Sequence, residues 1–119
     1  MIIRSVEEIR SWKKDDNGWY VSPDGTHIIL GDNVYIGHDV DIGDNVVIHN
    51  NVGIGDNTII GNGVVIQHNV RICRDVIIGN TVLLENNVTL GIGVVIDDGI
   101  SIASNTKLPR GAEIYNLHM

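Results

Sequence analysis

Aliphatic residues recur at every sixth position from residue 30 to residue 119, without an insertion. When the hexads are numbered from Leu30, position 1 is Ile or Leu in all fifteen of them. Position 5 is Val in ten hexads, and the remaining five carry Thr58, Ile100, Thr106, Ala112 and His118. Because a fixed period of this length is the signature of a repeat architecture, it takes precedence over local propensities in predicting the fold.

Each hexad predicts one short strand followed by a turn. Side chains alternate across a strand, so positions 5 and 1 face one side and positions 6 and 2 face the other. The aliphatic positions 5 and 1 must therefore form the interior. Position 4 is Asn, Asp or Gly in every hexad except those with Thr81 and Leu117. These residue types tolerate positive φ, so position 4 is expected to be a left-handed turn residue.

The hexad pattern resembles the hexapeptide-repeat family over residues 30–119. This resemblance implies an all-β fold, a left-handed parallel β-helix of triangular cross-section with three hexads in each coil. The left hand is an exception to the usual right-handed crossover. Fifteen hexads then give about five coils.

Residues 1–29 lie outside the repeat and predict a capping segment, which divides the chain into parts 1–29 and 30–119. Ser5 and Glu8 have the spacing of a capping box, and the apolar residues after them predict a short helix near residues 6–14. A strand over residues 19–21 and a tight turn over residues 22–25 are expected next. We expect this segment to cover the strand edges at the N-terminal end of the repeat.

A spacing of eighteen residues brings equivalent positions into vertical ladders. One corner is expected to carry a ladder of Asn33, Asn51, Asn69, Asn87 and Asn105, in which stacked amides can hydrogen-bond. One outward face is polar at position 6, with Tyr35, Gly53, Arg71, Thr89 and Lys107.

The other two outward faces are aliphatic and meet at one corner. Monomeric proteins rarely expose apolar stripes of this size, so we expect an interface, and the resemblance implies a homotrimer. The predicted interface residues are Val47, Ile59, Val65, Ile77, Leu83 and Val95. The alternative is that these residues reflect only the β-propensity of exposed strand positions.

The composition suits a narrow, regular interior, since only 4% of the residues are aromatic and Phe is absent. A net charge of −7 argues against nucleic acid or an anionic membrane surface as a partner. The lone Cys73 cannot form an internal disulfide, and neither a leader pattern nor a run near the ~20 apolar residues of a membrane helix is present. We therefore expect a cytoplasmic protein.

The histidines are the candidates for chemistry, and they are His27, His38, His49, His68 and His118. The family resemblance implies two activities: acyl transfer with a histidine in a cleft between subunits, and γ-class carbonic anhydration with a metal held by three histidines. The metal pattern has two histidines five residues apart, whereas successive histidines here are 11, 11, 19 and 50 residues apart. We therefore expect no metal site, unless the ligands come from different subunits.

Residues 66–70, Ile-Gln-His-Asn-Val, are similar to the segment around the catalytic histidine in acyltransferases of lipid A synthesis and in sugar-nucleotide N-acetyltransferases. The resemblance implies that His68 is a general base, with acetyl-CoA or another acyl-CoA as the donor. His38, in a segment of the same form, is the alternative. His68 is favoured because it ends the aliphatic face that carries Val65 and so borders the expected subunit cleft. The residues expected at the rim of this cleft are His49, Gln67, Asn69 and Glu85.

Two functions from different classes remain open, and a γ-class carbonic anhydrase-like metal protein is a weaker third. The first is a small acyltransferase acting on a sugar or another hydroxyl or amine acceptor. The second is a noncatalytic trimeric β-helix, for example a phage or surface-fibre component, which the uninterrupted repeat favours. His68 stands at an exposed turn position where most hexads have Asp or Asn, so a histidine there does not require a catalytic role.

Overall fold

The chain forms an all-β solenoid with a small cap, in a computed structural model that describes residues 1–116. Strands of successive coils stack into three sheets, here called A, B and C. Sheet A contains β1 (Ile2–Ile3), β6 (Val40–Ile42), β9 (Ile59–Ile60), β12 (Ile77–Ile78), β15 (Val95–Ile96) and β18 (Glu113–Ile114). Sheet B contains β2 (Lys13–Lys14), β3 (Tyr20–Val21), β4 (His27–Leu30), β7 (Val46–Ile48), β10 (Val65–Ile66), β13 (Leu83–Leu84) and β16 (Ser101–Ile102). Sheet C contains β5 (Tyr35–Ile36), β8 (Gly53–Ile54), β11 (Arg71–Ile72), β14 (Thr89–Leu90) and β17 (Lys107–Leu108).

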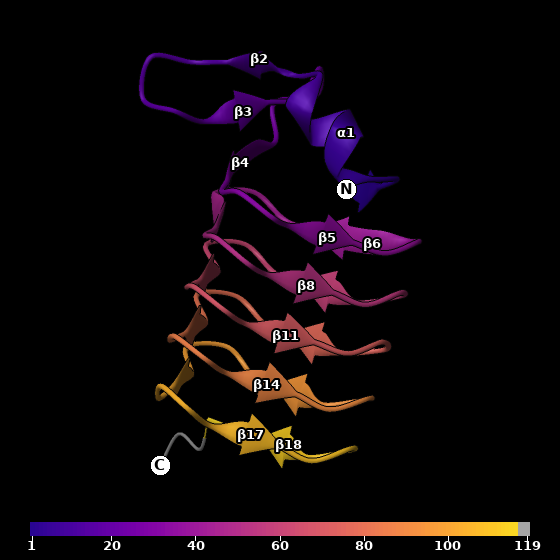
Figure 1. Cartoon of the computed structure of the whole chain (residues 1–119), viewed down its shortest axis with the longest axis vertical. Helices are drawn as coiled ribbons and strands as arrows, with labels where there is room; N and C mark the ends of the chain where they lie inside the picture. Colours follow the sequence, from indigo (N-terminus) through magenta and orange to yellow (C-terminus); the bar gives the residue numbers. More distant parts are fainter. Residues whose placement is uncertain (117–119) are drawn as a thin grey trace.

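The register between coils is eighteen residues, which confirms the reading of three hexads per coil. Val65 of β10 pairs in parallel with Val47 of β7 on one side and with Leu83 of β13 on the other. Figure 1 shows the coils stacked along the long axis, with the cap at the N-terminal end. Sheet C has five strands, one from each coil, as the count of hexads predicts. The hand of the winding stays a prediction from the resemblance.

The interior consists of positions 5 and 1, as the hexad pattern predicts. Val64, Ile66, Val88 and Leu90 are fully buried, and the same holds at almost every equivalent site in the middle coils. Thr58 is a polar exception inside the core, and its hydroxyl donates a hydrogen bond to the Cys73 carbonyl at 3.2 Å. Because a buried hydroxyl costs free energy unless it is bonded, this contact makes Thr tolerable at a Val position.

The turns have the predicted conformation at position 4. All fourteen position-4 residues in the described chain have positive φ, including Thr81 at 56°, although β-branched residues disfavour that region. Thr81 is held there by the coil before it, because its N–H donates to the Asn62 carbonyl at 2.8 Å. Leu117, the other exception in sequence, lies outside the described residues.

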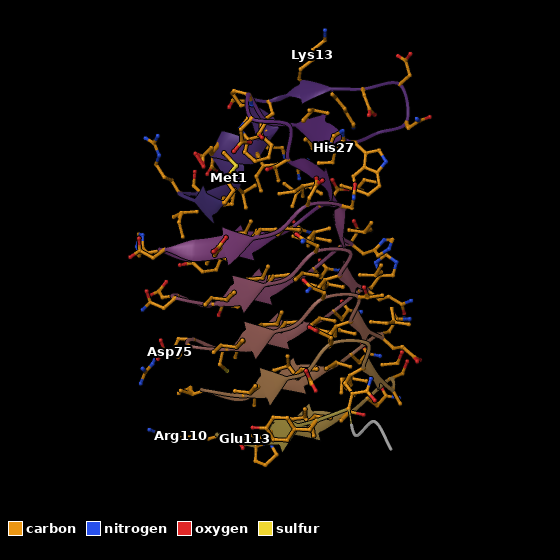
Figure 2. The ribbon with its side chains drawn as sticks, turned by 180° about the vertical axis from the view of Figure 1, so that it is seen from behind. Met1, Lys13, His27, Asp75, Arg110 and Glu113 are labelled. Atoms are coloured by element: carbon orange, nitrogen blue, oxygen red, sulfur yellow. The ribbon has the colours of Figure 1, made fainter. Side chains whose placement is uncertain are left out.

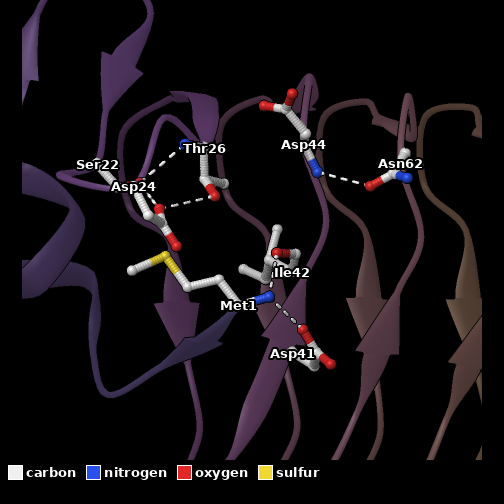
Figure 3. Close-up of polar contacts among 8 residues, drawn as sticks. All are labelled: Met1, Ser22, Asp24, Thr26, Asp41, Ile42, Asp44 and Asn62. Atoms are coloured by element: carbon white, nitrogen blue, oxygen red, sulfur yellow. Dashed lines mark hydrogen bonds and ion pairs between the residues drawn. The ribbon is translucent and has the colours of Figure 1, made fainter.

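The N-terminal segment closes two of the three sheets. β1 pairs antiparallel with β6 at the edge of sheet A, and β3 pairs antiparallel with β4 at the edge of sheet B. The Met1 nitrogen donates to the Asp41 carboxylate at 2.6 Å and to the Ile42 carbonyl at 3.1 Å; Figure 3 shows both contacts. In the described part of the chain, no strand of the cap pairs with β5 of sheet C.

The helix in the cap is shorter than the sequence predicts. It spans Val6–Arg10, and residues 13–14 form β2 of a hairpin instead of a last helical turn. Ser5 accepts the Glu8 N–H as expected, but the Glu8 carboxylate accepts the N–H of Arg4 and not that of Ser5. Within residues 1–116, no helix has the length and apolar character needed to cross a membrane.

Candidate functional site

The three corners between the sheets carry the side chains at positions 2, 3 and 4. The B/C corner contains residues 31–33, 49–51, 67–69, 85–87 and 103–105, and the C/A corner contains residues 37–39, 55–57, 73–75, 91–93 and 109–111. The A/B corner contains residues 43–45, 61–63, 79–81 and 97–99. In Figure 2, Asp75 and Arg110 lie along one edge of the stack, and they belong to the C/A corner.

Position 3 forms a second ladder, which runs between coils and which the sequence analysis missed. At the A/B corner, Asp44 N–H donates to Asn62 Oδ1 at 2.8 Å; Figure 3 shows the contact. The same bond joins Asn62 to Asn80 at 2.8 Å, and Asn80 to Asp98 at 2.7 Å. Each side chain therefore accepts a backbone N–H that the turn would otherwise leave without a partner. The preference for Asp and Asn at position 3 was the signal for this ladder.

His68 occupies one rung of the same ladder at the B/C corner. Asn50 N–H donates to His68 Nδ1 at 3.2 Å, and His68 N–H donates to Asn86 Oδ1 at 3.0 Å. An imidazole whose Nδ1 accepts a hydrogen bond carries its proton on Nε2 when neutral. The exposed side of His68 thus presents an N–H in this conformation. His68 thus accepts a backbone N–H as an Asn would, and it exposes a second ring nitrogen as well.

His49 lies against His68 at this corner, so the structure brings together two of the predicted site residues. Their ring centroids are 4.9 Å apart, at a tilt of 54°. Burial lowers the pKa of His49, and the charge of a protonated His68 lowers that pKa further. Both effects oppose the protonation of His49, so its neutral form is favoured more than that of a free imidazole.

Within residues 1–116, no hydrogen bond, ion pair or ring contact joins the His68 ring to Gln67, Asn69 or Glu85. Glu85 Oε1 accepts a hydrogen bond from Ser104 Oγ at 3.2 Å. The backbone N–H groups of Gln67 and Asn69 are both used between coils, on the carbonyls of Leu84 and Asn50. Neither of these two N–H groups is therefore spare for an oxyanion.

The other described histidines lie elsewhere. His38 is exposed at the C/A corner and borders a shallow groove of about 300 Å³ beside Arg4 and Glu7 of the cap. His27 begins β4, where its N–H donates to Asp44 Oδ1 at 2.7 Å and its ring meets Trp19 edge-on. No group of three metal-ligating side chains occurs among residues 1–116 of a single chain. His118 lies outside the described residues.

The predicted interface residues all point outward from sheets A and B. On sheet A, the exposed fractions of Ile59 and Ile77 are 46% and 45%, and Val95 is half-buried. On sheet B, Val47, Val65 and Leu83 are half-buried at the equivalent strand position. Both sheets therefore display an aliphatic stripe, with the A/B corner between them.

Sheet C has a pocket that the sequence analysis did not identify. It has a volume of about 600 Å³ and lies over Gly53, between Tyr35 and Arg71. The signal in the sequence was a glycine at outward position 6, between an aromatic residue and a cation one coil away on either side.

Comparisons with known proteins identify the repeat. The sequence family described as "Bacterial transferase hexapeptide (six repeats)" matches residues 25–55 and 51–86. No curated protein matches the chain.

Among the solved structures that are similar to the chain, two are each 18% identical to it. The N-terminal domain of CcmM in complex with CcmN has a TM-score of 0.41, and the match covers 79% of this chain and 87% of that one. A histidine-to-asparagine mutant of perosamine N-acetyltransferase from Caulobacter crescentus, in complex with CoA and GDP-perosamine, has a TM-score of 0.49, with coverage of 81% and 47%. Likenesses at this level do not bear on what the chain binds.

Proposed function

The chain belongs to the bacterial transferase hexapeptide family, and we propose that it is a homotrimeric acyltransferase that uses the His49–His68 pair. The observation that supports this function is the contact of two imidazoles at 4.9 Å, at the corner where the aliphatic sheet B ends. The acyl donor is acetyl-CoA or another acyl-CoA, and the acceptor is a hydroxyl or amine on a sugar or another small molecule. A cytoplasmic location is consistent with this activity.

His68 is the proposed general base. It takes the proton of the acceptor as the acceptor oxygen or nitrogen attacks the thioester carbonyl. The tetrahedral intermediate collapses by breaking the C–S bond, and the imidazolium returns its proton to the leaving CoA thiolate. The net result is one acyl ester or amide and one free thiol, with His68 restored.

The hydrogen bond from Asn50 adds a requirement to this mechanism. His68 Nδ1 accepts that N–H, so its exposed Nε2 carries the proton and has no lone pair for a base. A catalytic His68 has to turn its ring away from Asn50 before it can accept a proton. The same rotation releases the Asn50 N–H, which becomes a donor for the oxyanion next to the N–H groups of Gln67 and Asn69, which are already used.

The proposed trimer packs sheet A of one subunit against sheet B of the next. This arrangement covers Ile59 and Ile77, whose exposure is otherwise costly in water. It also places the B/C corner with His68 opposite the C/A corner of the neighbouring subunit, which carries His38 and Arg74. The cleft between these two corners is the proposed place for the substrates.

The test is a thiol-release assay with acetyl-CoA and a panel of sugar and amine acceptors, on the wild type and on His68→Ala. We expect acceptor-dependent release from the wild type and a loss of about 10²- to 10⁴-fold in the variant. Activity that survives the substitution removes His68 as the base, and no release with any donor or acceptor contradicts the enzyme. Sedimentation of the wild type at micromolar concentration tests the trimer separately, and a monomer contradicts it.

A noncatalytic trimeric β-helix is the second candidate, and one observation favours it. His68 Nδ1 accepts the N–H of Asn50 in the same way that Asn62 and Asn80 accept theirs at the A/B corner. His68 thus has a structural role whether or not it catalyses. A trimer in solution that neither binds CoA nor releases thiol supports this second function.

A further inference from the structure

We propose that the pocket on sheet C binds a small ligand that combines a flat aromatic ring with a phosphate or carboxylate group. The pocket, of about 600 Å³, is formed by the outward faces of β5, β8 and β11 and extends to Asn69 at the B/C corner. This proposal does not depend on acyl transfer, because neither His49 nor His68 lines the pocket.

Gly53 lacks a side chain at a position where the backbone does not require a glycine. The chain has fourteen glycines, all in the described residues. Six have positive φ, and at seven others an added Cβ would come within 3 Å of the next coil. Gly53 alone has neither feature, and a Cβ there would meet nothing within 4 Å. Glycine weakens a strand interior, and where it is kept it often marks a close approach by a ligand.

The side chains of Tyr35 and Arg71 form the two walls of the pocket, and between them the layer of Gly53 has no side chain. Gly53 pairs with Tyr35 of the coil before it and with Arg71 of the coil after it. Stacked strands are about 4.8 Å apart, so a ring placed over Gly53 lies about one strand spacing from each wall. That spacing is within the range of roughly 4.5–7 Å for stacked aromatic rings and about 6 Å for a cation over a ring. The empty layer therefore fits a planar group between a phenol and a guanidinium.

The charge of the pocket selects an anion. No carboxylate is among the lining residues of the described chain, although the protein carries a net charge of −7. Within residues 1–116 the Arg71 side chain forms no ion pair or hydrogen bond, whereas Arg74 is paired with Asp75 at 2.8 Å. A free guanidinium offers a planar pair of donors to a phosphate or a carboxylate. Tyr35 is 63% exposed, so its ring is open to a ligand.

The probes for the test are phenyl phosphate, benzoate and AMP, with phenol and inorganic phosphate as controls that lack the charge or the ring. Binding is followed through the backbone amide signals of Gly53 and Gly55 in two-dimensional NMR spectra of the full chain. Protection of Cys73 from alkylation is a second readout, because Cys73 lines the pocket and is the only cysteine. We expect at least one of the three probes to bind at least tenfold more tightly than either control. If phenyl phosphate binds most tightly, the preferred ligand is an aryl phosphate. If benzoate binds most tightly, it is an aromatic carboxylate, and if AMP does, it is a nucleotide. Each of these results supports the proposal.

Two matched pairs of variants locate the binding. Gly53→Leu fills the empty layer and is expected to weaken the best probe at least tenfold, whereas Thr89→Leu, two coils further along the same sheet, leaves binding within twofold. Arg71→Gln is expected to weaken the probe at least fivefold, whereas Lys107→Gln leaves binding within twofold. The proposal is overturned if none of the three probes shifts the amide signals of Gly53 and Gly55. It is also overturned if Gly53→Leu and Arg71→Gln, whose NMR spectra show that they are folded, bind the probe as tightly as the wild type does.

Discussion

The A/B and B/C corners use different side chains to accept the backbone N–H groups of their turns. At both corners a position-3 side chain accepts an N–H from the preceding coil, yet the A/B corner uses only Asn and Asp, while the B/C corner uses His68 for one rung. Position 2 differs as well, with Gly61 and Gly79 at the A/B corner and His49 and Gln67 at the B/C corner. The A/B corner is bare and closely packed at these two glycines, whereas the B/C corner carries imidazoles at positions 2 and 3. Each turn of the repeat needs one side-chain acceptor at position 3. A histidine such as His68 supplies this acceptor through Nδ1 and adds a second ring nitrogen, Nε2, while the backbone hydrogen bonds of the ladder are kept.

The largest expected effect separates the two roles of His68. His68→Asn keeps an acceptor of the type that stands at the A/B rungs, so the free energy of unfolding is expected to stay within about 0.5 kcal/mol of the wild type. Acyl transfer is expected to fall by about 10²- to 10⁴-fold, because the base is removed. Urea unfolding and thiol release measure the two effects on the same samples. If His68→Asn instead lost stability and kept full activity, His68 would be a structural residue and not the general base.

The second effect contrasts position 2 of the two corners. An added Cβ at Gly79 would lie 2.7 Å from the Asp98 backbone nitrogen, so Gly79→Ala is expected to cost about 1–3 kcal/mol of unfolding free energy. Gln67→Ala removes only a half-exposed side chain at the B/C corner, and its cost is expected to stay within about 0.5 kcal/mol. Equal costs in urea unfolding would show that the two corners are equally tolerant.

The third effect tests whether the rungs are equivalent. Asn80→Ala leaves the Asn62 N–H without its acceptor, which is expected to cost about 1 kcal/mol. His68→Ala does the same to Asn50, at a longer donor–acceptor distance of 3.2 Å, and is expected to cost no more. Thermal unfolding of both variants beside His68→Asn measures the two rungs. If His68→Ala lowered the unfolding free energy more than Asn80→Ala does, the imidazole would stabilise the fold by more than its one accepted hydrogen bond.

The smallest effect is a pH dependence at the B/C corner. The pKa of His49 is lowered from 6.5 by burial and by the charge of His68, so the unfolded chain binds a proton more readily than the folded one. Unfolding then takes up a proton, and the contribution of His49 to stability falls as the pH drops below about 6.5. His49→Gln is expected to lose less stability between pH 7.5 and pH 5.5 than the wild type does, by urea unfolding at each pH. A parallel decline in both proteins would contradict this role of His49.

Most of the architecture was predictable from the sequence because a six-residue period encodes the register directly. A strand side chain can face only one of two sides, so a uniform aliphatic position such as Ile66 has to face the interior. The turn at Asn69 was predictable for a similar reason, since few residue types tolerate positive φ. The cap was less predictable. Its helix ends at Arg10 because residues 13–14 pair with β3, and a contact across the cap overrides helical spacing.

The sequence by itself determined the solenoid, its five coils, the aliphatic stripes of sheets A and B, and the candidacy of His68. Only the tertiary structure decided what surrounds these residues. It showed that Nδ1 of His68 accepts a backbone N–H, that His49 lies against it, and that Gly53 leaves an open layer between Tyr35 and Arg71. The physical reason is that the period sets which residues share a ladder, whereas the contacts of a side chain depend on its rotation and on the coil beside it.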